Sequence, residues 1–143
     1  MPTRSSLAHH HLRLGLWWVV VFAAAGLVLE SLHGLKLELY VDVQSQTRRH
    51  MWTLAHAHGT LLGLIHLAYA ALLPQLDDLP ASCRQRAGAR LTVAAVCLPG
   101  GFFLGGLWFY AGDPGLGILL VPIGALALIW ACLTLLGGLR GRD

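Results

Sequence analysis

Four long apolar stretches, separated by short polar segments, dominate the hydrophobic pattern of the chain. They cover residues 14–34, 51–73, 87–110 and 114–138. Each stretch is long enough to cross about 30 Å of hydrocarbon as a helix. We expect helices because lipid offers no hydrogen-bond partners to backbone N–H and C=O groups. The pattern therefore predicts an all-α fold, an integral membrane four-helix bundle that forms one domain over residues 1–143.

The charges predict how this bundle is oriented. With 56% hydrophobic and 12% charged residues, the chain is too apolar for an ordinary soluble protein. Seven arginines flank the stretches on one side: Arg4, Arg13, Arg84, Arg86, Arg90, Arg140 and Arg142. The other side carries Lys36, Arg48 and Arg49. This bias predicts a multi-pass protein of the cell membrane with both termini in the cytoplasm. The net charge of +3 then reflects topology, and we expect no nucleic-acid partner.

The first apolar stretch has a second interpretation, a cleaved signal peptide. Arg4 and Arg13 would form its basic region, residues 14–22 its apolar region and residues 23–25 a cleavage site of small residues. The apolar stretch continues to Leu29, however, which gives it the length of a full span. We therefore favour an uncleaved first helix.

Ionisable residues lie inside two of the predicted spans. Glu30 and His33 close the first stretch, and His56 and His58 open the second. Such side chains are costly in a bilayer, so they usually face a protein interior and mark a functional site. Because consecutive spans are antiparallel, all four residues lie near the outer face at a similar depth. They form the candidate site of the chain.

Helical spacing arranges these residues into two stripes. The stripe on the first helix contains Ala23, Gly26, Glu30 and His33, and that on the second contains Thr53, His56, Gly59, Gly63 and His66. Small residues at this spacing let membrane helices approach closely. Aligned by depth, Glu30 meets His56 and Gly26 meets Gly59. His58 lies about 200° around the helix from His56, so we expect it to face the third and fourth helices or lipid.

The chemistry of these side chains indicates a cofactor. Imidazole nitrogen with carboxylate oxygen suits an iron, copper or zinc ion, and imidazole alone suits haem iron. A haem b between the helices would take axial ligands from His33, His56 and His58, while Glu30 fixes an imidazole tautomer. A ferritin-like di-iron site is not expected, because it needs a second Glu-x-x-His motif. This interpretation predicts a small electron-transfer protein or a cofactor-bearing subunit. Whether the chain is an enzyme stays open.

One short segment has a local resemblance to a known family. Ala57-His58-Gly59-Thr60-Leu61-Leu62 resembles the His-Gly segment on the second helix of haem–copper oxidase subunit I, whose histidine ligates the low-spin haem. The resemblance implies a haem ligand at His58 alone. It departs from the family pattern at Leu62, where a methionine is usual, and it covers no other part of the chain. It therefore implies haem binding and not oxygen reduction.

Two other functions compete with cofactor binding. In the first, Glu30 and His56 hydrogen-bond across the helix pair as polar glue, worth about 0.6–2 kcal/mol, in a non-catalytic subunit. Its partners in the lipid bilayer would be other membrane subunits or a second copy of the chain. The second is a proton or small-solute pathway, in which His66 continues the ionisable line inward.

Several local features give further expectations. Residues 9–11, all histidine, should lie in a polar tail facing solvent or headgroups. Asp113 before Pro114 should cap the fourth helix at its start. Pro99 and Pro122 should kink the third and fourth helices. Four tryptophans near span ends should anchor the helices at the interface: Trp17, Trp18, Trp52 and Trp108.

Overall fold

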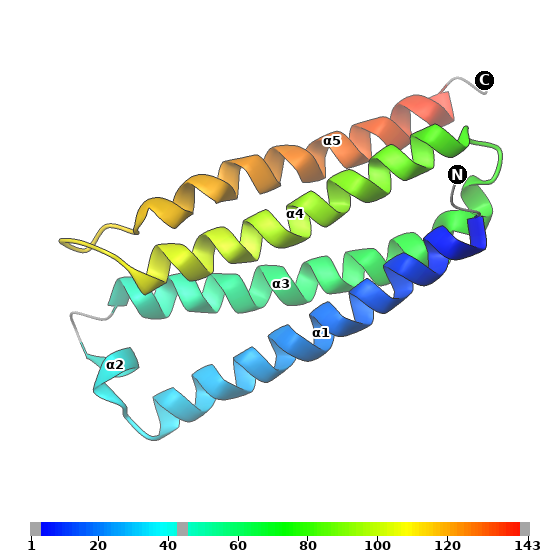
Figure 1. The fold of residues 1–143 in the computed structure, drawn as a ribbon. Coiled ribbons are helices and arrows are strands. Elements are labelled where there is room, and N and C mark those ends of the chain that lie inside the picture. The colour runs from blue at the N-terminus through cyan, green and yellow to red at the C-terminus, as the bar shows by residue number, and fades with distance from the viewer. Residues whose placement is uncertain (1–3, 43–45, 141–143) are drawn as a thin grey trace.

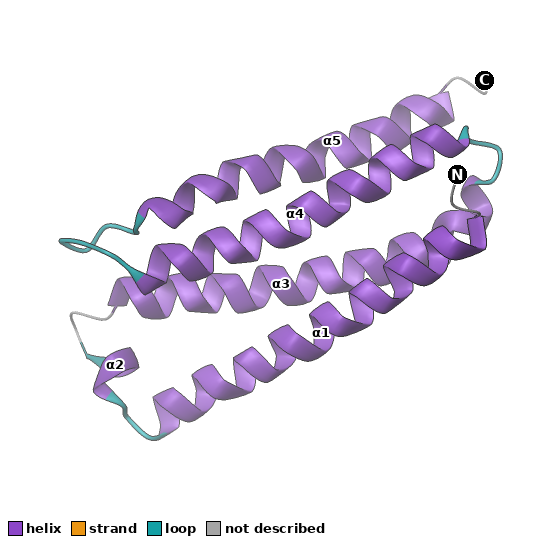
Figure 2. Cartoon of the chain, viewed as in Figure 1, coloured by secondary structure: helices purple, strands orange, loops and turns teal. Residues whose placement is uncertain are grey.

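The regular elements of the chain are helical throughout the described residues, 4–42 and 46–140 of the computed structural model (Figures 1 and 2). The α-helices are α1 (Arg4–Gly34), α2 (Glu38–Val41), α3 (Gln46–Leu72), α4 (Ala81–Leu107) and α5 (Leu120–Arg140). Short 3₁₀ turns, η2 (Leu73–Leu76) and η3 (Leu116–Leu119), follow α3 and precede α5. Four of these helices are long and apolar enough to cross a membrane. This confirms the predicted all-α class and the number of long helices.

The ends of two helices differ from the prediction. α1 begins at Arg4, so the histidines at residues 9–11 belong to its first turns rather than to a polar tail. α5 begins at Leu120, and Asp113 does not cap it, because the backbone of Asp113 pairs with Tyr110 to close the turn after α4. Pro122 therefore lies in the first turn of α5, where a missing N–H costs little, and not in mid-helix.

The long helices form a row rather than a closed bundle (Figure 1). Each packs against its neighbour in sequence, α1 on α3, α3 on α4 and α4 on α5. α1 makes slight contact with α4, and no packed interface joins α1 to α5 in the described part of the chain. α1 begins and α5 ends at the same end of the molecule, while α2 and the α4–α5 connection lie at the other, which we call the α2 end.

The row has an inside and two open edges. In the most apolar 18-residue segment of α4, half of the residues are buried. The corresponding fraction of buried residues is 6% in α1 and 11% in the helix formed by η3 and α5. The core lies along the α3–α4 interface in two clusters. The cluster toward the α2 end is formed by Met51, Ala55, Leu62, Ala94, Ala95, Leu98 and Phe102, and the other by Tyr69, Leu73, Ala87, Leu91 and Ala131. The outer faces of α1 and α5 expose large apolar side chains along their lengths. Exposed apolar surface of this extent is typical of contact with a membrane or a partner protein.

Small residues line the α1–α3 interface, but Gly26 does not lie opposite Gly59 as predicted. Gly15 is the glycine of α1 that approaches a glycine of α3, because a Cβ there would come 2.8 Å from the carbonyl oxygen of Gly63. A Cβ on Gly26 would come 2.4 Å from Cε1 of His56, and a Cβ on Gly59 would come 2.3 Å from the ring of Phe22. Each glycine thus accommodates a ring from the other helix, which fills the space that glycine leaves. The predicted alignment of Gly26 with Gly59 is wrong by about one helical turn.

Tryptophan also has a structural role that was not predicted. The indole Nε1 of Trp18 donates a hydrogen bond to the carbonyl of Ala95, 3.0 Å away, and so ties α1 to α4. Trp52 of α3 donates to the carbonyl of Phe103 at 3.2 Å and stacks on its ring. Trp18 therefore also links two helices, and its predicted role as an interfacial anchor stays a prediction.

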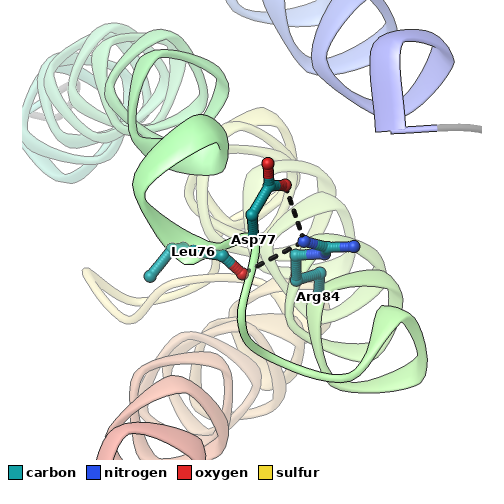
Figure 3. Close-up of polar contacts among 3 residues, drawn as sticks. All are labelled: Leu76, Asp77 and Arg84. Atoms are coloured by element: carbon teal, nitrogen blue, oxygen red, sulfur yellow. Dashed lines mark hydrogen bonds and ion pairs between the residues drawn. The ribbon is translucent and has the colours of Figure 1, made fainter.

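The α3–α4 connection is held by one arginine (Figure 3). Nη1 of Arg84 donates to the carbonyl of Leu76 at 3.1 Å and to Oδ1 of Asp77 at 3.0 Å. The ion pair is partly exposed, and such pairs contribute about 0.2–1 kcal/mol. The hydroxyl of Tyr69 also donates to the carbonyl of Arg84 at 2.6 Å. These bonds hold the start of α4 beside the last turns of α3.

A second arginine joins the elements at the α2 end. The guanidinium of Arg48 lies over the rings of Trp52 and Phe109, at 5.7 and 5.1 Å from their centroids. It also donates to the carbonyls of Gly106 and Leu39. Arg48 therefore connects the α2 segment, α3 and the end of α4, and it fixes the surroundings of the predicted site.

Candidate functional site

His56 lies on the face of α3 that packs against α1. Its Nδ1 is 2.6 Å from the carbonyl oxygen of Phe22, and its ring lies against Gly26. A carbonyl oxygen only accepts hydrogen bonds, so Nδ1 carries the proton and Nε2 of the neutral ring has a free lone pair. A histidine that ligates a metal is commonly held in this way, with one N–H bonded to a carbonyl and the other nitrogen facing the metal.

His58 has the same tautomer but faces the opposite way. Its Nδ1 donates to the carbonyl of Leu54 at 2.8 Å, within α3. Its ring contacts Phe102 of α4, with centroids 4.8 Å apart. The prediction was that His58 turns away from His56, toward the later helices or lipid, and the contact with Phe102 shows that it faces α4. The two histidines consequently belong to different interfaces.

Glu30 and His56 meet at one cavity at the α2 end. The cavity has a volume of about 460 Å³, and Tyr40 and Thr53 also line it. Glu30 is exposed, and no hydrogen bond joins it to His56 among the described residues. The hydroxyls of Tyr40 and Thr53 are 3.4 Å apart. His33 is exposed and lies edge-on to Tyr40, and it is not among the residues that line the cavity.

A second cavity adjoins His56, and its lining is apolar. It has a volume of about 300 Å³ and lies between α1, α3 and α4. Its lining residues are Phe22, Ala25, Val28, Leu29, Leu32, Trp52, Ala55, His56 and Phe103. His56 contributes to both cavities and is the ionisable member of this second one. A ligand bound at His56 would therefore have polar groups on one side and an apolar wall on the other.

The donor set distinguishes between the kinds of cofactor that were predicted. In residues 4–42 and 46–140, no three His, Cys, Asp or Glu side chains gather as they would around a metal ion. A protein-bound zinc ion usually takes three or four such ligands. Haem iron needs one or two, because the porphyrin supplies the others.

The structure also brings together two histidines that the sequence did not pair. Nδ1 of His11, on α1, lies 2.8 Å from Nδ1 of His66, on α3, and the side chains are 1% and 0% exposed. The expectation that His11 lies in a polar tail is therefore wrong. The sequence did contain one indication that His11 faces α3. His11 and Gly15 have helical spacing with Phe22 and Gly26, and so they lie on the same face of α1.

Three helices enclose this histidine pair. Tyr69 of α3 lies edge-on to His11, with centroids 4.9 Å apart. Gly88 of α4 packs against the Nε2 edge of the His11 ring, because a Cβ on Gly88 would come 2.4 Å from that nitrogen. Nε2 of His66 is buried, and it has no hydrogen-bond partner in the part of the chain that the structure describes. Buried polar atoms are almost always paired, so this nitrogen is a candidate for a functional role.

Comparison with known proteins adds no relative. No family model, curated protein or solved structure matches the chain. The local resemblance of residues 57–62 to haem–copper oxidase subunit I therefore stays a prediction.

Proposed function

We propose that this protein is an integral protein of the cell membrane that binds a haem between α1 and α3, with His56 as an axial ligand. Four helices of membrane-spanning length and the exposed apolar faces of α1 and α5 support insertion in a bilayer. The excess of arginine at the end where α1 begins supports a cytoplasmic location for both termini. Electron transfer through the bound haem would be its activity, alone or as a subunit.

The hydrogen bond from His56 to Phe22 is the observation that carries this proposal. It fixes the ring and keeps the proton on Nδ1, so that Nε2 is available to bind iron. His56 lies several turns inside the span of α3, where an ionisable residue is expensive and tends to be functional. A site that needs one or two histidines also agrees with the donor set, which offers no cluster of three ligands in the described residues.

The two cavities at His56 support a ligand with both polar and apolar parts. The 300 Å³ cavity is lined by aliphatic and aromatic side chains, and it would contact one apolar edge of a macrocycle rather than enclose it. The 460 Å³ cavity offers the hydroxyls of Tyr40 and Thr53 and the carboxylate of Glu30. In this proposal Glu30 accepts a hydrogen bond near the cofactor and is not itself a ligand.

A second candidate function is a non-catalytic subunit of a larger membrane complex. The open row of helices favours it, because α1 and α5 leave most of their apolar surface uncovered. In that case His56 and His58 would serve as packing groups whose Nδ1 atoms are satisfied by backbone carbonyls. Another membrane subunit or a second copy of the chain would cover the exposed faces.

Visible absorption spectroscopy separates these candidates. The protein is expressed with a supply of haem precursor, extracted in mild detergent and analysed together with His56→Ala, His58→Ala and His9→Ala variants. We expect a Soret band in the wild type and in the His9→Ala and His58→Ala variants, and its loss in His56→Ala. His9 is the control because its ring is exposed and its Nδ1 donates to the carbonyl of Ser5 within α1.

Each other result argues against the proposal in a specific way. Loss of the band in His58→Ala with retention in His56→Ala would place the haem at α4, as the oxidase resemblance implies. If elemental analysis finds iron, copper or zinc and the spectrum has no Soret band, the cofactor is a metal ion and not haem. A colourless, metal-free protein with all variants folded would favour the non-catalytic subunit.

A further inference from the structure

The His11–His66 pair lies well away from the proposed haem site, near the end where α1 begins. The two ring planes differ by 13°, the centroids are 4.9 Å apart and the Nδ1 atoms are 2.8 Å apart. The rings are close to parallel and displaced sideways, so that their facing edges meet. This displaced arrangement brings the two Nδ1 atoms within hydrogen-bonding distance of each other.

The nitrogen–nitrogen distance decides which ligand this geometry holds. A separation of 2.8 Å is normal for a hydrogen bond in which one nitrogen donates and the other accepts. A metal ion in line between the rings would need nitrogens about 4 Å apart, twice a bond of ~2.0 Å. We propose that His11 and His66 form an internal proton-binding site in which one proton is shared between their Nδ1 atoms.

The tautomers follow from the shared hydrogen bond. In the neutral pair one ring has its proton on Nδ1 and a bare Nε2, whereas the other accepts at Nδ1 and has its proton on Nε2. An added proton binds the bare Nε2, and that ring becomes an imidazolium. The Nδ1 proton can then pass to the other ring, which releases its own Nε2 proton. One proton enters and one leaves, so the pair is a two-membered relay between Nε2 of His11 and Nε2 of His66.

A second added proton is excluded by the same geometry. Two imidazolium rings would both carry a proton on Nδ1, so neither could accept, and two cations would lie within contact distance in a buried site. The titration of two such close groups belongs to the pair and not to either residue. The site therefore takes up one proton where two independent histidines would take up two.

The surroundings suggest how a proton reaches the pair. His10, exposed on α1, lies edge-on to His11 with centroids 5.2 Å apart and is the nearest exposed titratable ring. Tyr69 and Cys83 are buried and donate to backbone carbonyls, and the guanidinium of Arg84 is held by η2 and Asp77. On the His66 side of the pair, the backbone of Leu91 is close enough to interact with the ring. Within residues 4–42 and 46–140, however, Nε2 of His66 has no hydrogen-bond partner of normal geometry. Nε2 of His66 is therefore the atom at which the relay accepts or releases a proton at the end opposite His10.

Nitrogen NMR of the wild-type protein tests the proposal directly. Protein labelled with ¹⁵N-histidine is placed in phospholipid nanodiscs and examined for scalar coupling between the two Nδ1 atoms across the hydrogen bond. We expect a coupled pair whose nitrogen shifts move together with pH and correspond to one proton taken up. His9→Gln and His10→Gln should retain the coupling, and His66→Gln should abolish it and leave His11 titrating alone.

Two results would overturn the proposal. Absence of the coupling in the folded wild type, or independent uptake of two protons, would mean that the rings merely pack together. Loss of the coupling on addition of one equivalent of Zn²⁺ or Cu⁺, and its return with a chelator, would identify a metal site instead. Because the decisive measurement uses the wild type, a misfolded His66→Gln variant leaves it intact. The outcome is also independent of the haem assay, which reports on His56.

Discussion

The imidazole of His56 lies against the α-carbon of Gly26, and its Nδ1 is bonded to the carbonyl of Phe22 one turn earlier on α1. A Cβ at residue 26 would be 2.4 to 2.9 Å from three atoms of the ring, which real Cβ atoms do not approach. Glycine at this position therefore permits both the close contact of α1 with α3 and the hydrogen bond that fixes the tautomer of His56.

Substituting Gly26 tests this relationship. We expect Gly26→Ala to displace the His56 ring and to reduce the free energy of unfolding by about 1–3 kcal/mol. Thermal unfolding in detergent measures the change, and a Soret band, if present, should weaken in parallel. Gly34→Ala is the matched control, because nothing lies within 4 Å of a Cβ there. Equal stability of the two variants would show that the His56 ring does not rest on Gly26.

Glu30 should affect cofactor retention through its charge. Glu30→Gln keeps the shape of the side chain but loses the carboxylate at the cavity that it shares with His56. If the carboxylate of Glu30 supports a bound haem, the substitution should weaken haem affinity by roughly 10-fold or more. Loss of a hydrogen-bond partner of a ligand commonly has an effect of this size. Haem titration followed by absorbance gives the affinity. Unchanged affinity would assign Glu30 to the exposed surface alone.

Trp18 should contribute to stability through its indole N–H. Trp18→Phe leaves the carbonyl of Ala95 without its donor, and we expect a loss of about 1–3 kcal/mol in the free energy of unfolding. Trp17→Phe is the control, since Trp17 is 64% exposed on the neighbouring position of α1. Denaturation in mixed micelles measures both. A larger effect at Trp17 than at Trp18 would contradict the bridge from α1 to α4.

The proposed topology is open to cysteine labelling. Single cysteines replace Asp42, at the α2 end, and Gln75, in the α3–α4 connection, in a background without Cys83, Cys97 and Cys132. In intact cells an impermeant maleimide should modify residue 42 and leave residue 75 unmodified until the membrane is opened. The reverse pattern would place the proposed haem site at the cytoplasmic face, against the arginine bias.

Part of the candidate site could be predicted because helical periodicity is local. The angle between His56 and His58 follows from their spacing on one helix, and the structure confirms that they face different neighbours. The alignment of α1 with α3 could not be predicted in the same way. Matching glycine with glycine gave the wrong register, since the contact is made by rings that fill the gaps beside Gly26 and Gly59.

The sequence by itself determined the helical class, the number and order of the long apolar helices and the spacing of the ionisable residues along them. These properties depend on the length and spacing of apolar residues within single segments. Only the tertiary structure decided that the helices form an open row, that Trp18 bridges to Ala95 and that His11 meets His66. Such contacts join residues far apart in the chain, and they are set by which side chains interlock when helices pack, a property that no single segment carries.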